Sequence, residues 1–450
     1  MVTPDPPPPC KCPSTGQKIT CVFGGFLLLS RGTRVEAELA RRWMVLSEEV
    51  STEGNRHGGS SGFLATASGD NSVPGAMPET WRELHQAAGN GDIYLVRRLL
   101  KQGAPTESRD ENGWTPLHAA SLHGYVRLVK FLLRRGAAVH ATDHAGHTPL
   151  HHAAWSGRTQ VAAILLARGA PAAASTAAGL SPLHCAAANG HTLVAQLLLG
   201  QGGAAAGGGR GRWAALHWAT AGGQLHIMDL LLSRGSGPDL GGRGGLTPLH
   251  VAAEAGRADA LRLLLAQGAT LDIRDDLGRT PLSIAAANGY HEIVKALLQS
   301  RADANLADCF GCTALHKAAT AGHLLSVRLL VEEGGSGVNS PDGLRLTPLH
   351  RAARCGHADV ASYLLEHGAG VNAAGWLGKT PLHLAAEERH SVMVQLLLAR
   401  GASPELRSWW KEPAEASALG APGVDAMPGG PQTSPPRFSD ASLPPHPAEY

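Results

Sequence analysis

Histidine is the residue type with the most obvious chemical potential in this chain of 450 residues, because imidazole binds metal ions and transfers protons near neutral pH. The sequence contains 23 histidines, and five of them cluster in one short stretch: His140, His144, His147, His151 and His152. Clustered imidazoles hold zinc when further ligands complete a tetrahedron. No cysteine pair or carboxylate shares a zinc-ligand spacing with these five, so we interpret them as structural and expect no metal site.

Cysteine offers the second candidate site, since thiolates are both metal ligands and redox groups. Cys309 and Cys312 form one C-x-x-C pair around Phe310 and Gly311. With no second pair and no histidine pair nearby, this is weak evidence for zinc, and a redox role stays a remote alternative. The chain has seven cysteines, an odd number without the spacing of a disulfide framework. This usage favours a reducing compartment, and we expect the cytoplasm or the nucleus.

Motifs of nucleotide binding and hydrolysis are absent from the sequence. It has no P-loop, no dinucleotide-binding strand–glycine–helix unit, no H-E-x-x-H and no G-x-S-x-G. The formal net charge of +2 provides no global attraction for nucleic acid or an anionic membrane. No apolar run reaches the roughly 18 residues that span a bilayer. We therefore expect neither an enzyme nor a cofactor, no nucleic-acid partner and no membrane insertion.

A fixed period organises most of the histidines. The tetrapeptide Thr-Pro-Leu-His begins at Thr115, and near-copies begin at residues 148, 181, 214, 247, 280, 313, 347 and 380, so that every step is 33 residues except one of 34. An atypical copy precedes them at Arg82, ahead of Leu84 and His85. A period of this length is typical of a solenoid of stacked units. We expect the motif imidazoles to bind neighbouring backbone or the capping hydroxyl.

Each unit carries the start and stop signals of two short helices. Thr115 can cap the first helix, the following proline suits its first turn, and Gly124 ends it where a positive φ is needed. Apolar residues at i, i+3 and i+4 then predict a second helix: Val129, Leu132 and Leu133. A turn-rich stretch at 143–146 leads to the next threonine and is expected to form a hairpin.

These features resemble the ankyrin repeat family, through T-P-L-H-x-A-A, the glycine in mid-unit, V-x-x-L-L and G-A. The resemblance implies an all-α fold, an α-solenoid of stacked helix–turn–helix units with β-hairpin loops. It covers residues 79–410, with a largely disordered head at 1–78 and a disordered tail rich in Pro, Ala, Gly and Ser at 411–450. The ten expected repeats are 79–110, 111–143, 144–176, 177–209, 210–242, 243–275, 276–308, 309–342, 343–375 and 376–410.

One part of the array departs from the pattern. Residues 204–211 are almost all Ala and Gly, and Ala214 stands where the next unit should have its capping threonine. Loss of a cap costs about 1 kcal/mol. The sequence leaves two interpretations open, a flexible seam in the array or drift without mechanical effect.

The resemblance also implies the function, which is protein binding on the concave face of the solenoid. It places partner contacts one, three and four residues before each motif threonine and seven and eight residues after it. The expected contact residues are Trp114, Leu122, His123, His147, Trp155, Leu180, Asn189, Trp213, Leu246, Glu254, Asp276, Arg279, Phe310, Leu346, Arg354, Trp376, Lys379 and Glu387. Tryptophan and arginine are common among interface hot spots, although a residue next to the threonine can instead pack on the following hairpin.

We therefore expect a monomeric, non-catalytic scaffold that binds an unidentified protein. The alternative is a regulatory adaptor whose tails carry the specificity, and a metal- or redox-active protein is the remote one. The resemblance further implies that an asparaginyl hydroxylase can modify hairpin asparagines eight residues after a leucine, which here points to Asn305 and Asn372.

Overall fold

The computed structural model of the protein describes residues 79–176, 178–203 and 213–409. The two segments predicted to be disordered, 1–78 and 411–450, lie outside the described residues, and so does the Ala- and Gly-rich stretch at 204–211. The structure therefore tests the prediction of a solenoid. The predictions of disordered tails and of a flexible seam remain predictions.

The described residues form 20 α-helices in ten consecutive pairs. We call the first member of each pair the inner helix: α2 (Glu79–Asn90), α4 (Pro116–His123), α6 (Pro149–Trp155), α8 (Pro182–Asn189), α10 (Ala215–Gly222), α12 (Pro248–Glu254), α14 (Pro281–Asn288), α16 (Ala314–Ala321), α18 (Pro348–Cys355) and α20 (Pro381–Glu387). The second member is the outer helix: α3 (Ile93–Lys101), α5 (Val126–Arg134), α7 (Thr159–Ala167), α9 (Thr192–Gly200), α11 (Leu225–Ser233), α13 (Ala258–Ala266), α15 (His291–Gln299), α17 (Leu324–Glu332), α19 (Ala358–Glu366) and α21 (Ser391–Ala399).

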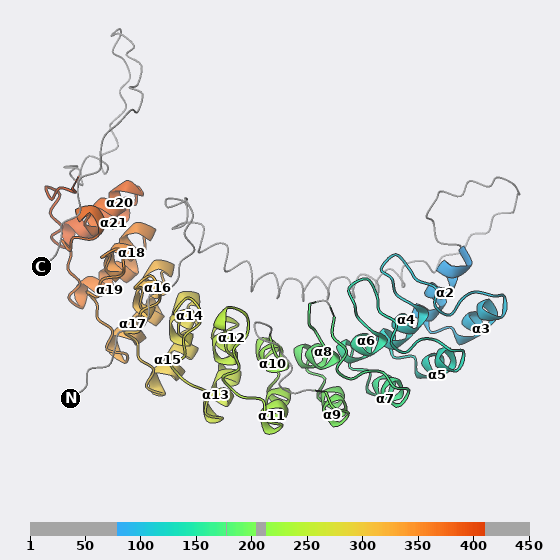
Figure 1. Cartoon of the computed structure of the whole chain (residues 1–450). Coiled ribbons are helices and arrows are strands. Elements are labelled where there is room, and N and C mark those ends of the chain that lie inside the picture. Colours follow the sequence, from blue (N-terminus) through green and yellow to red (C-terminus); the bar gives the residue numbers. More distant parts are fainter. Residues whose placement is uncertain (1–78, 177, 204–212, 410–450) are drawn as a thin grey trace, which may run out of the picture.

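The pairs stack in chain order into an arc. The inner helices line the inside of the curve and the outer helices its outside (Figure 1). The predicted all-α solenoid is confirmed. Within the described ranges, no helix has both the length and the apolar character that a bilayer span requires.

The loops between pairs differ from the prediction in one respect. They contain no β-strand among the described residues, so the β-hairpins are reduced to tight turns. In one such turn the Asp143 N–H donates to the His147 carbonyl oxygen (2.9 Å) and the Gly146 N–H donates to the Asp143 carbonyl oxygen (3.0 Å). The Asp143 carboxylate accepts from the N–H groups of Ala145 (3.0 Å) and His147 (2.7 Å). The turn closes on itself, which leaves its two legs too short to pair as strands.

Consecutive turns are also joined to one another through the backbone. The Cys309 N–H donates to the Leu277 carbonyl oxygen, and the Gly343 N–H donates to the Phe310 carbonyl oxygen, both at 2.9 Å. The same bond links Trp409 to Leu377. Several of the described turns are therefore held both by their own hydrogen bonds and by the turn before them. Two of these turns contain a short 3₁₀ helix, η1 (Arg243–Gly245) and η2 (Trp376–Gly378).

Leucine and alanine make up most of the core. Leu117 and Leu132, from the inner and outer helix of one pair, have no exposed surface, and the same positions are buried in pair after pair. Each buried leucine contributes about 1.5–3 kcal/mol relative to an exposed one. Alanines on the inner helices, such as Ala120 and Ala153, keep the side chains between neighbouring pairs small enough for close packing. A single pair buries little by itself, so stability depends on its neighbours.

Two physical constraints favour glycine at the end of the inner helices, a positive φ and the close approach of a side chain from the next pair. Gly322 has a φ of 76°, and a Cβ placed on it would lie 2.5 Å from Nδ1 of His357 in the next pair. Gly268, which follows an outer helix, has a φ of 82° but no atom within 4 Å of such a Cβ. The two exceptions to the glycine pattern fit this difference. Arg301 takes the open position, and Arg389 takes the covered position only in the last described pair, over which no other pair of the described residues lies.

We predict that Gly322→Ala destabilises the array more than Gly268→Ala. Both substitutions place a side chain in the left-handed region, at a cost of about 1 kcal/mol. Only the first also forces the His357 ring away, which adds about 1–3 kcal/mol. Urea denaturation followed by circular dichroism measures the difference, and equal losses for the two variants would show that the overlying side chain is not a constraint.

Candidate functional site

The motif histidines connect each helix pair to the next turn. The Thr115 N–H donates to Nδ1 of His118 (3.0 Å), so this nitrogen carries no proton, and Nε2–H donates to the His147 carbonyl oxygen (3.1 Å). The Thr115 hydroxyl lies 2.9 Å from the same Nδ1. Six more imidazoles bond the next turn in the same way, at 3.0–3.2 Å, through the pairs His151–Leu180, His184–Trp213, His217–Leu246, His250–Arg279, His316–Leu346 and His350–Lys379. We call this series the histidine ladder.

Burial keeps the ladder uncharged. Desolvation lowers the pKa of His118 and of His151 to about 3, and that of His350 to about 4. Near neutral pH these imidazoles are neutral hydrogen-bond donors with both nitrogens engaged. Their structural role matches the prediction.

The histidine cluster at 140–152 surrounds a buried carboxylate. His147 Nδ1 and His152 Nε2 each lie 3.3 Å from Oδ2 of Asp143. Burial by itself would raise the pKa of the Asp143 carboxyl, but hydrogen bonds from the two imidazoles and from the His147 backbone hold that pKa below its usual range. His151 belongs to the histidine ladder, while His140 and His144 are exposed. Across the part of the chain that the structure describes, no three His, Cys, Asp or Glu side chains are grouped to hold a metal ion.

Other turns stabilise their buried aspartate with a base nine residues later. Lys317 Nζ lies 2.7 Å from Oδ2 of Asp308, and Arg351 Nε donates to Oδ2 of Asp342 (3.0 Å). Buried carboxylates are costly unless they are paired, so the turn residue and the helix residue depend on each other. Where the helix residue is apolar, the turn residue can be a glycine, as in the pair Gly242 and Val251, or an aspartate with another partner, as Asp275 has in Arg279.

The C-x-x-C pair spans a turn and places its two cysteines in different environments. Cys312 is buried, with its sulfur 3.9 Å from Oδ2 of Asp342 and 3.8 Å from a guanidinium nitrogen of Arg351, and burial raises the pKa of its thiol. Cys309 is exposed on the tip of the turn. A buried thiol with a raised pKa is a poor nucleophile and a poor ligand at neutral pH.

Four of the predicted contact residues are buried, and the prediction needs correction there. Leu122, Leu246 and Leu346 are covered by neighbouring side chains, and His147 is engaged with Asp143. Leu246 and Leu346 each directly precede a motif threonine, where their carbonyl oxygens accept from the histidine ladder. Their position against the preceding pair leaves little side-chain surface for a partner.

The predicted tryptophans are partly exposed and partly used in packing. The Trp114 ring meets His152 edge-on at 4.6 Å between centroids, and Trp213 meets Trp218 at 5.4 Å. The Trp155 carbonyl oxygen accepts from Nε2 of His191 in the next pair (2.8 Å). The other predicted residues that are neither buried nor fully exposed are His123, Leu180, Asn189, Glu254, Arg279, Arg354 and Lys379.

Several predicted charged residues already have partners within the array. Arg279 Nε lies 2.7 Å from Oδ2 of Asp275, and Lys379 forms an ion pair with Glu387. Arg354 Nε lies 3.5 Å from a Glu388 carboxylate oxygen. The Arg354–Glu388 pair is partly exposed, and such pairs contribute about 0–1 kcal/mol, whereas the Asp275 carboxylate is buried and depends on Arg279.

The most exposed apolar residues of the predicted set lie on the tips of the last turns. Phe310 is 61% exposed and Trp376 is 54% exposed. The structure adds residues that the sequence analysis missed. Leu277, Leu344 and Leu377 occupy the position of Phe310 in their own turns, and Trp409, 74% exposed, occupies that of Trp376. We call these six the hairpin ridge: Leu277, Phe310, Leu344, Trp376, Leu377 and Trp409. The 33-residue step from Trp376 to Trp409 was visible in the sequence.

The two candidate hydroxylation sites have amides that bridge neighbouring turns. Oδ1 of Asn305 accepts from the Gly337 N–H (3.1 Å), and Oδ1 of Asn372 accepts from the Ser403 N–H (2.9 Å). Both side chains are exposed. Hydroxylation at either position stays a prediction.

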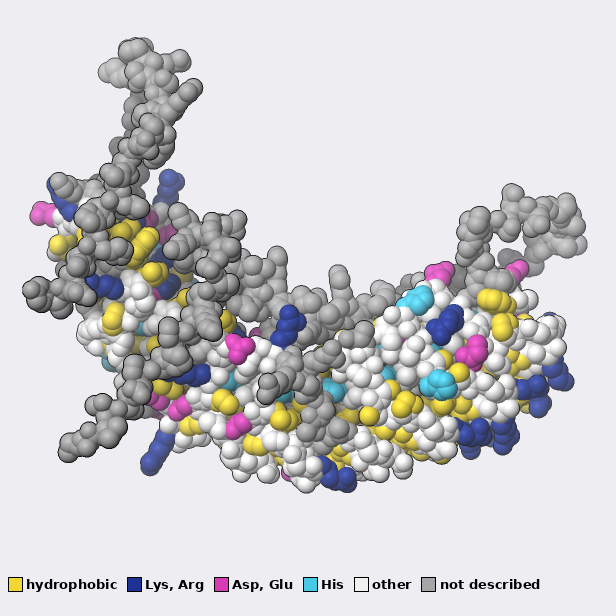
Figure 2. Space-filling view, viewed as in Figure 1, with side chains coloured by type: hydrophobic (Ala, Val, Ile, Leu, Met, Phe, Trp, Pro, Cys, Tyr) yellow, Lys and Arg dark blue, Asp and Glu magenta, His cyan; other side chains and the backbone are white. Residues whose placement is uncertain are grey.

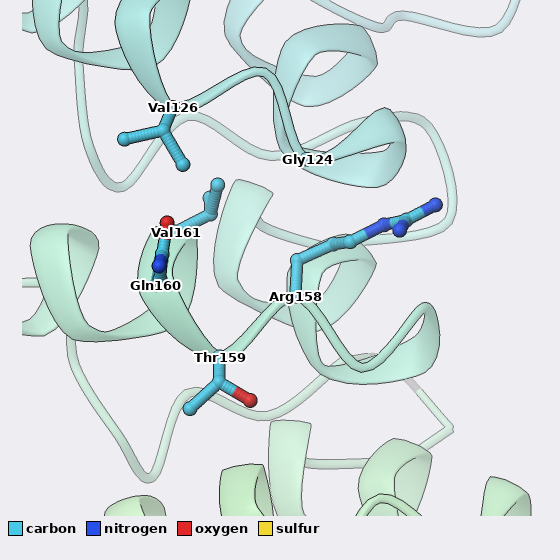
Figure 3. A pocket seen from close by; sticks show the side chains of 6 residues that line it. All are labelled: Gly124, Val126, Arg158, Thr159, Gln160 and Val161. Carbon is cyan, nitrogen blue, oxygen red and sulfur yellow. The ribbon is translucent and has the colours of Figure 1, made fainter.

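The hollows between outer helices are shallow. One of about 210 Å³ lies where α5 and α7 begin, and the Arg158 side chain extends beside Gly124 at its rim (Figure 3). The Arg158 Nε–H donates to the Leu122 carbonyl oxygen (3.1 Å). Its lining of Val126, Thr159 and Val161 contains no acid, nucleophile or metal ligand, so the hollow is a junction between two pairs.

Comparison with known proteins agrees with the architecture. The family model described as "Ankyrin repeats (3 copies)" matches residues 84–176, 169–243, 236–308, 300–375 and 334–408, which together cover well over half of the chain. A search of curated proteins found no match.

We predict that His316→Ser weakens the array by about 1 kcal/mol through loss of the hydrogen bond to the Leu346 carbonyl oxygen. Ser283 shows that a serine at this position keeps the local cap, because its Oγ accepts from the Thr280 N–H (3.0 Å) and donates to the Thr280 carbonyl oxygen (2.8 Å). Ser283→His provides the reverse test and should add about 1 kcal/mol by completing the histidine ladder. Denaturation at pH 7.5 that ranks the two variants in the opposite order would contradict this assignment.

We also predict that the array loses stability as the pH falls from about 7 to 5. The pKa of seven motif histidines is lowered by burial: His85, His118, His151, His217, His250, His316 and His350. In the folded chain burial makes these imidazoles harder to protonate, whereas the unfolded chain takes up protons below the ordinary histidine pKa of 6.5. Stability is therefore present above this value and declines below it, by up to about 1.4 kcal/mol per pH unit for each histidine. Urea midpoints at pH 7.5, 6 and 5 measure the slope, and a flat profile would show that the ladder is accessible to protons.

Proposed function

The chain belongs to the ankyrin repeat family, whose repeats are modules of protein–protein interaction, and from this premise we propose that it is a non-catalytic scaffold that binds a protein partner. We propose further that the ten helix pairs act as ten repeats with the boundaries predicted from the sequence. The protein is proposed to act as a monomer in the cytoplasm or the nucleus, as the odd number of cysteines suggested.

The hairpin ridge is the observation that carries this proposal. Aromatic side chains that are largely exposed, such as Phe310, Trp376 and Trp409, have no role in the core and represent surface that a partner can cover. Their backbones are fixed by the bonds between turns, so little conformational entropy is lost on binding. Aromatic residues on a rigid support are typical anchors of interfaces.

The composition of the turns limits the proposed surface to the C-terminal part of the arc. At the tips of the first turns stand Glu111, Asn112 and His144, which are polar and exposed. Around the hairpin ridge lie charged residues in exposed ion pairs, including Lys379 with Glu387. An apolar centre with a polar rim is the usual anatomy of a protein interface. The contact set predicted from the family pattern is thereby narrowed from the whole length of the arc to its last turns.

The alternative, an adaptor whose tails carry the specificity, concerns residues outside the described ranges. It predicts that partner binding requires the tails and does not require the hairpin ridge. The remote alternative of a metal or redox protein would use Cys309 and Cys312, whose different environments give it no support.

We predict that Phe310→Ser combined with Trp376→Ser removes partner binding without unfolding the array. The side chains are largely exposed, so the change in unfolding free energy should be within about 0.5 kcal/mol for each substitution. Loss of two aromatic anchors should weaken binding by about 2–4 kcal/mol, or at least about thirtyfold. Proximity labelling in cells, with the variant beside the intact chain, measures which neighbouring proteins are lost.

The matched control is Tyr94→Ser with Val392→Ser, which removes two equally exposed apolar side chains from outer helices. This control should keep the neighbours of the intact chain. A third form that lacks residues 1–78 and 411–450 separates the alternatives. If the labelled neighbours persist in the ridge variant and are lost when the tails are removed, the adaptor hypothesis is supported and the scaffold hypothesis is contradicted.

A further inference from the structure

A dense positive patch covers the outside of the first two helix pairs. Seven exposed basic residues lie on α3, on α5 or directly after α5: Arg97, Arg98, Lys101, Arg127, Lys130, Arg134 and Arg135. We call this set the basic patch. The dark blue side chains gathered at the lower right of Figure 2 lie over the end of the arc where Figure 1 places α3 and α5. It lies on the outer face of the arc, away from the turns.

Neither helix offers these cations an acidic partner. Among the described residues, none of the seven forms an ion pair, and α3 and α5 contain no Asp or Glu. The Asp92 carboxylate caps α3 by accepting from the Tyr94 and Leu95 N–H groups. The next outer helices, α7 and α9, carry no charged residue, and Arg168, directly after α7, repeats only the position of Arg135.

Fold stability explains only part of the patch. Cations near a helix C-terminus are favoured by its dipole, which accounts for Lys101 and Arg134. Arg127 lies in the first turn of α5, where the dipole disfavours a positive charge, and Lys130 lies in the middle of the helix, where the dipole gives it no stabilisation. Arg97 and Arg135 lie 5.7 and 5.5 Å from the centre of the Phe131 ring, and these contacts hold two guanidinium groups in place.

The patch is regular because the repeat is regular. Arg97 and Lys130 occupy the same position in consecutive pairs, and so do Lys101 and Arg134. Along each helix the two positions are one turn apart, about 6 Å, and neighbouring helices lie about 8–10 Å apart. Alternate side chains of an extended peptide project from one face about 6.6 Å apart. A peptide with a carboxylate at every second residue therefore matches a row of this lattice.

We propose that the basic patch docks a short acidic segment of a partner protein, in an extended conformation along the outer helices. Five of the seven cations are arginines, whose planar fork suits carboxylates. This site is separate from the hairpin ridge and does not rest on the function proposed for it.

The charge of the whole chain favours a short segment over a long polyanion. The formal net charge is +2 while the basic patch alone carries seven positive charges, so the remainder of the chain sums to five negative charges. A membrane surface or a DNA duplex extends beyond two helices, over the uncharged helices α7 and α9. A segment of about four residues, about 13 Å when extended, matches the length of the nine-residue helix α5 and stays within the patch.

The test is fluorescence anisotropy of a labelled octapeptide of alternating Glu and Ser, titrated with the full-length chain at low salt. The variant Arg97→Glu with Lys130→Glu should weaken binding about tenfold. The matched control is Arg262→Glu with Lys295→Glu, which reverses two exposed charges at the same register on α13 and α15. The affinity of the control for the peptide should be within about twofold of that of the intact chain. Added salt should weaken peptide binding by the intact chain and by the control.

Three results would overturn the proposal. The first is no binding by the intact chain, and the second is an equal loss in both variants, which would show general charge attraction. The third is tighter, patch-dependent binding of phosphatidylserine vesicles or of a short DNA duplex, which would assign the basic patch to a membrane or to nucleic acid. Unchanged thermal unfolding of both variants shows that they remain folded.

Discussion

The hydrogen bond from a motif imidazole to the carbonyl oxygen of the next turn is the interaction on which the architecture depends. It fixes three things at once: the start of an inner helix, the tautomer of the ring and the position of the following turn. At His118 the same ring binds Thr115 within its own pair and reaches His147 in the next. Because every contact of this kind is between neighbours, the array is held together link by link, with no centre.

Much of the fold could be predicted from one sequence because the same helix signals recur in every unit. The Thr-Pro start, the glycine stop and the leucine spacing are local signals, and the helices form where those signals place them. The exposure of single residues is a different matter. Leu246 and Leu346 occupy a position that the family pattern assigns to partners, yet the fold covers them. The packing of the next pair determines which side of a turn is covered. The local sequence therefore does not predict which of these residues are buried.

The coupling between turn and helix was also hidden in the sequence. Asp308 with Lys317 and Asp342 with Arg351 are nine residues apart, a spacing without meaning until the turn folds back on its own helix. The strands expected in the loops did not form, because turns such as that of Asp143 satisfy their backbone groups with their own aspartate, and several turns also bond the preceding turn. The same bonds that exclude strands keep the tips rigid. The exposed aromatic tips and the cationic outer helices lie toward opposite ends of the arc, so the two proposed binding surfaces do not overlap.

Arg389 has a consequence for the way such a chain can evolve. In every earlier pair this place is a glycine, because the next pair sets a side chain against it. With arginine there, a duplicated unit added at the C-terminal end would clash with the Arg389 side chain. A second molecule stacked end to end would meet the same clash. The Arg389 side chain therefore disfavours the close stacking of a further unit on the last described pair.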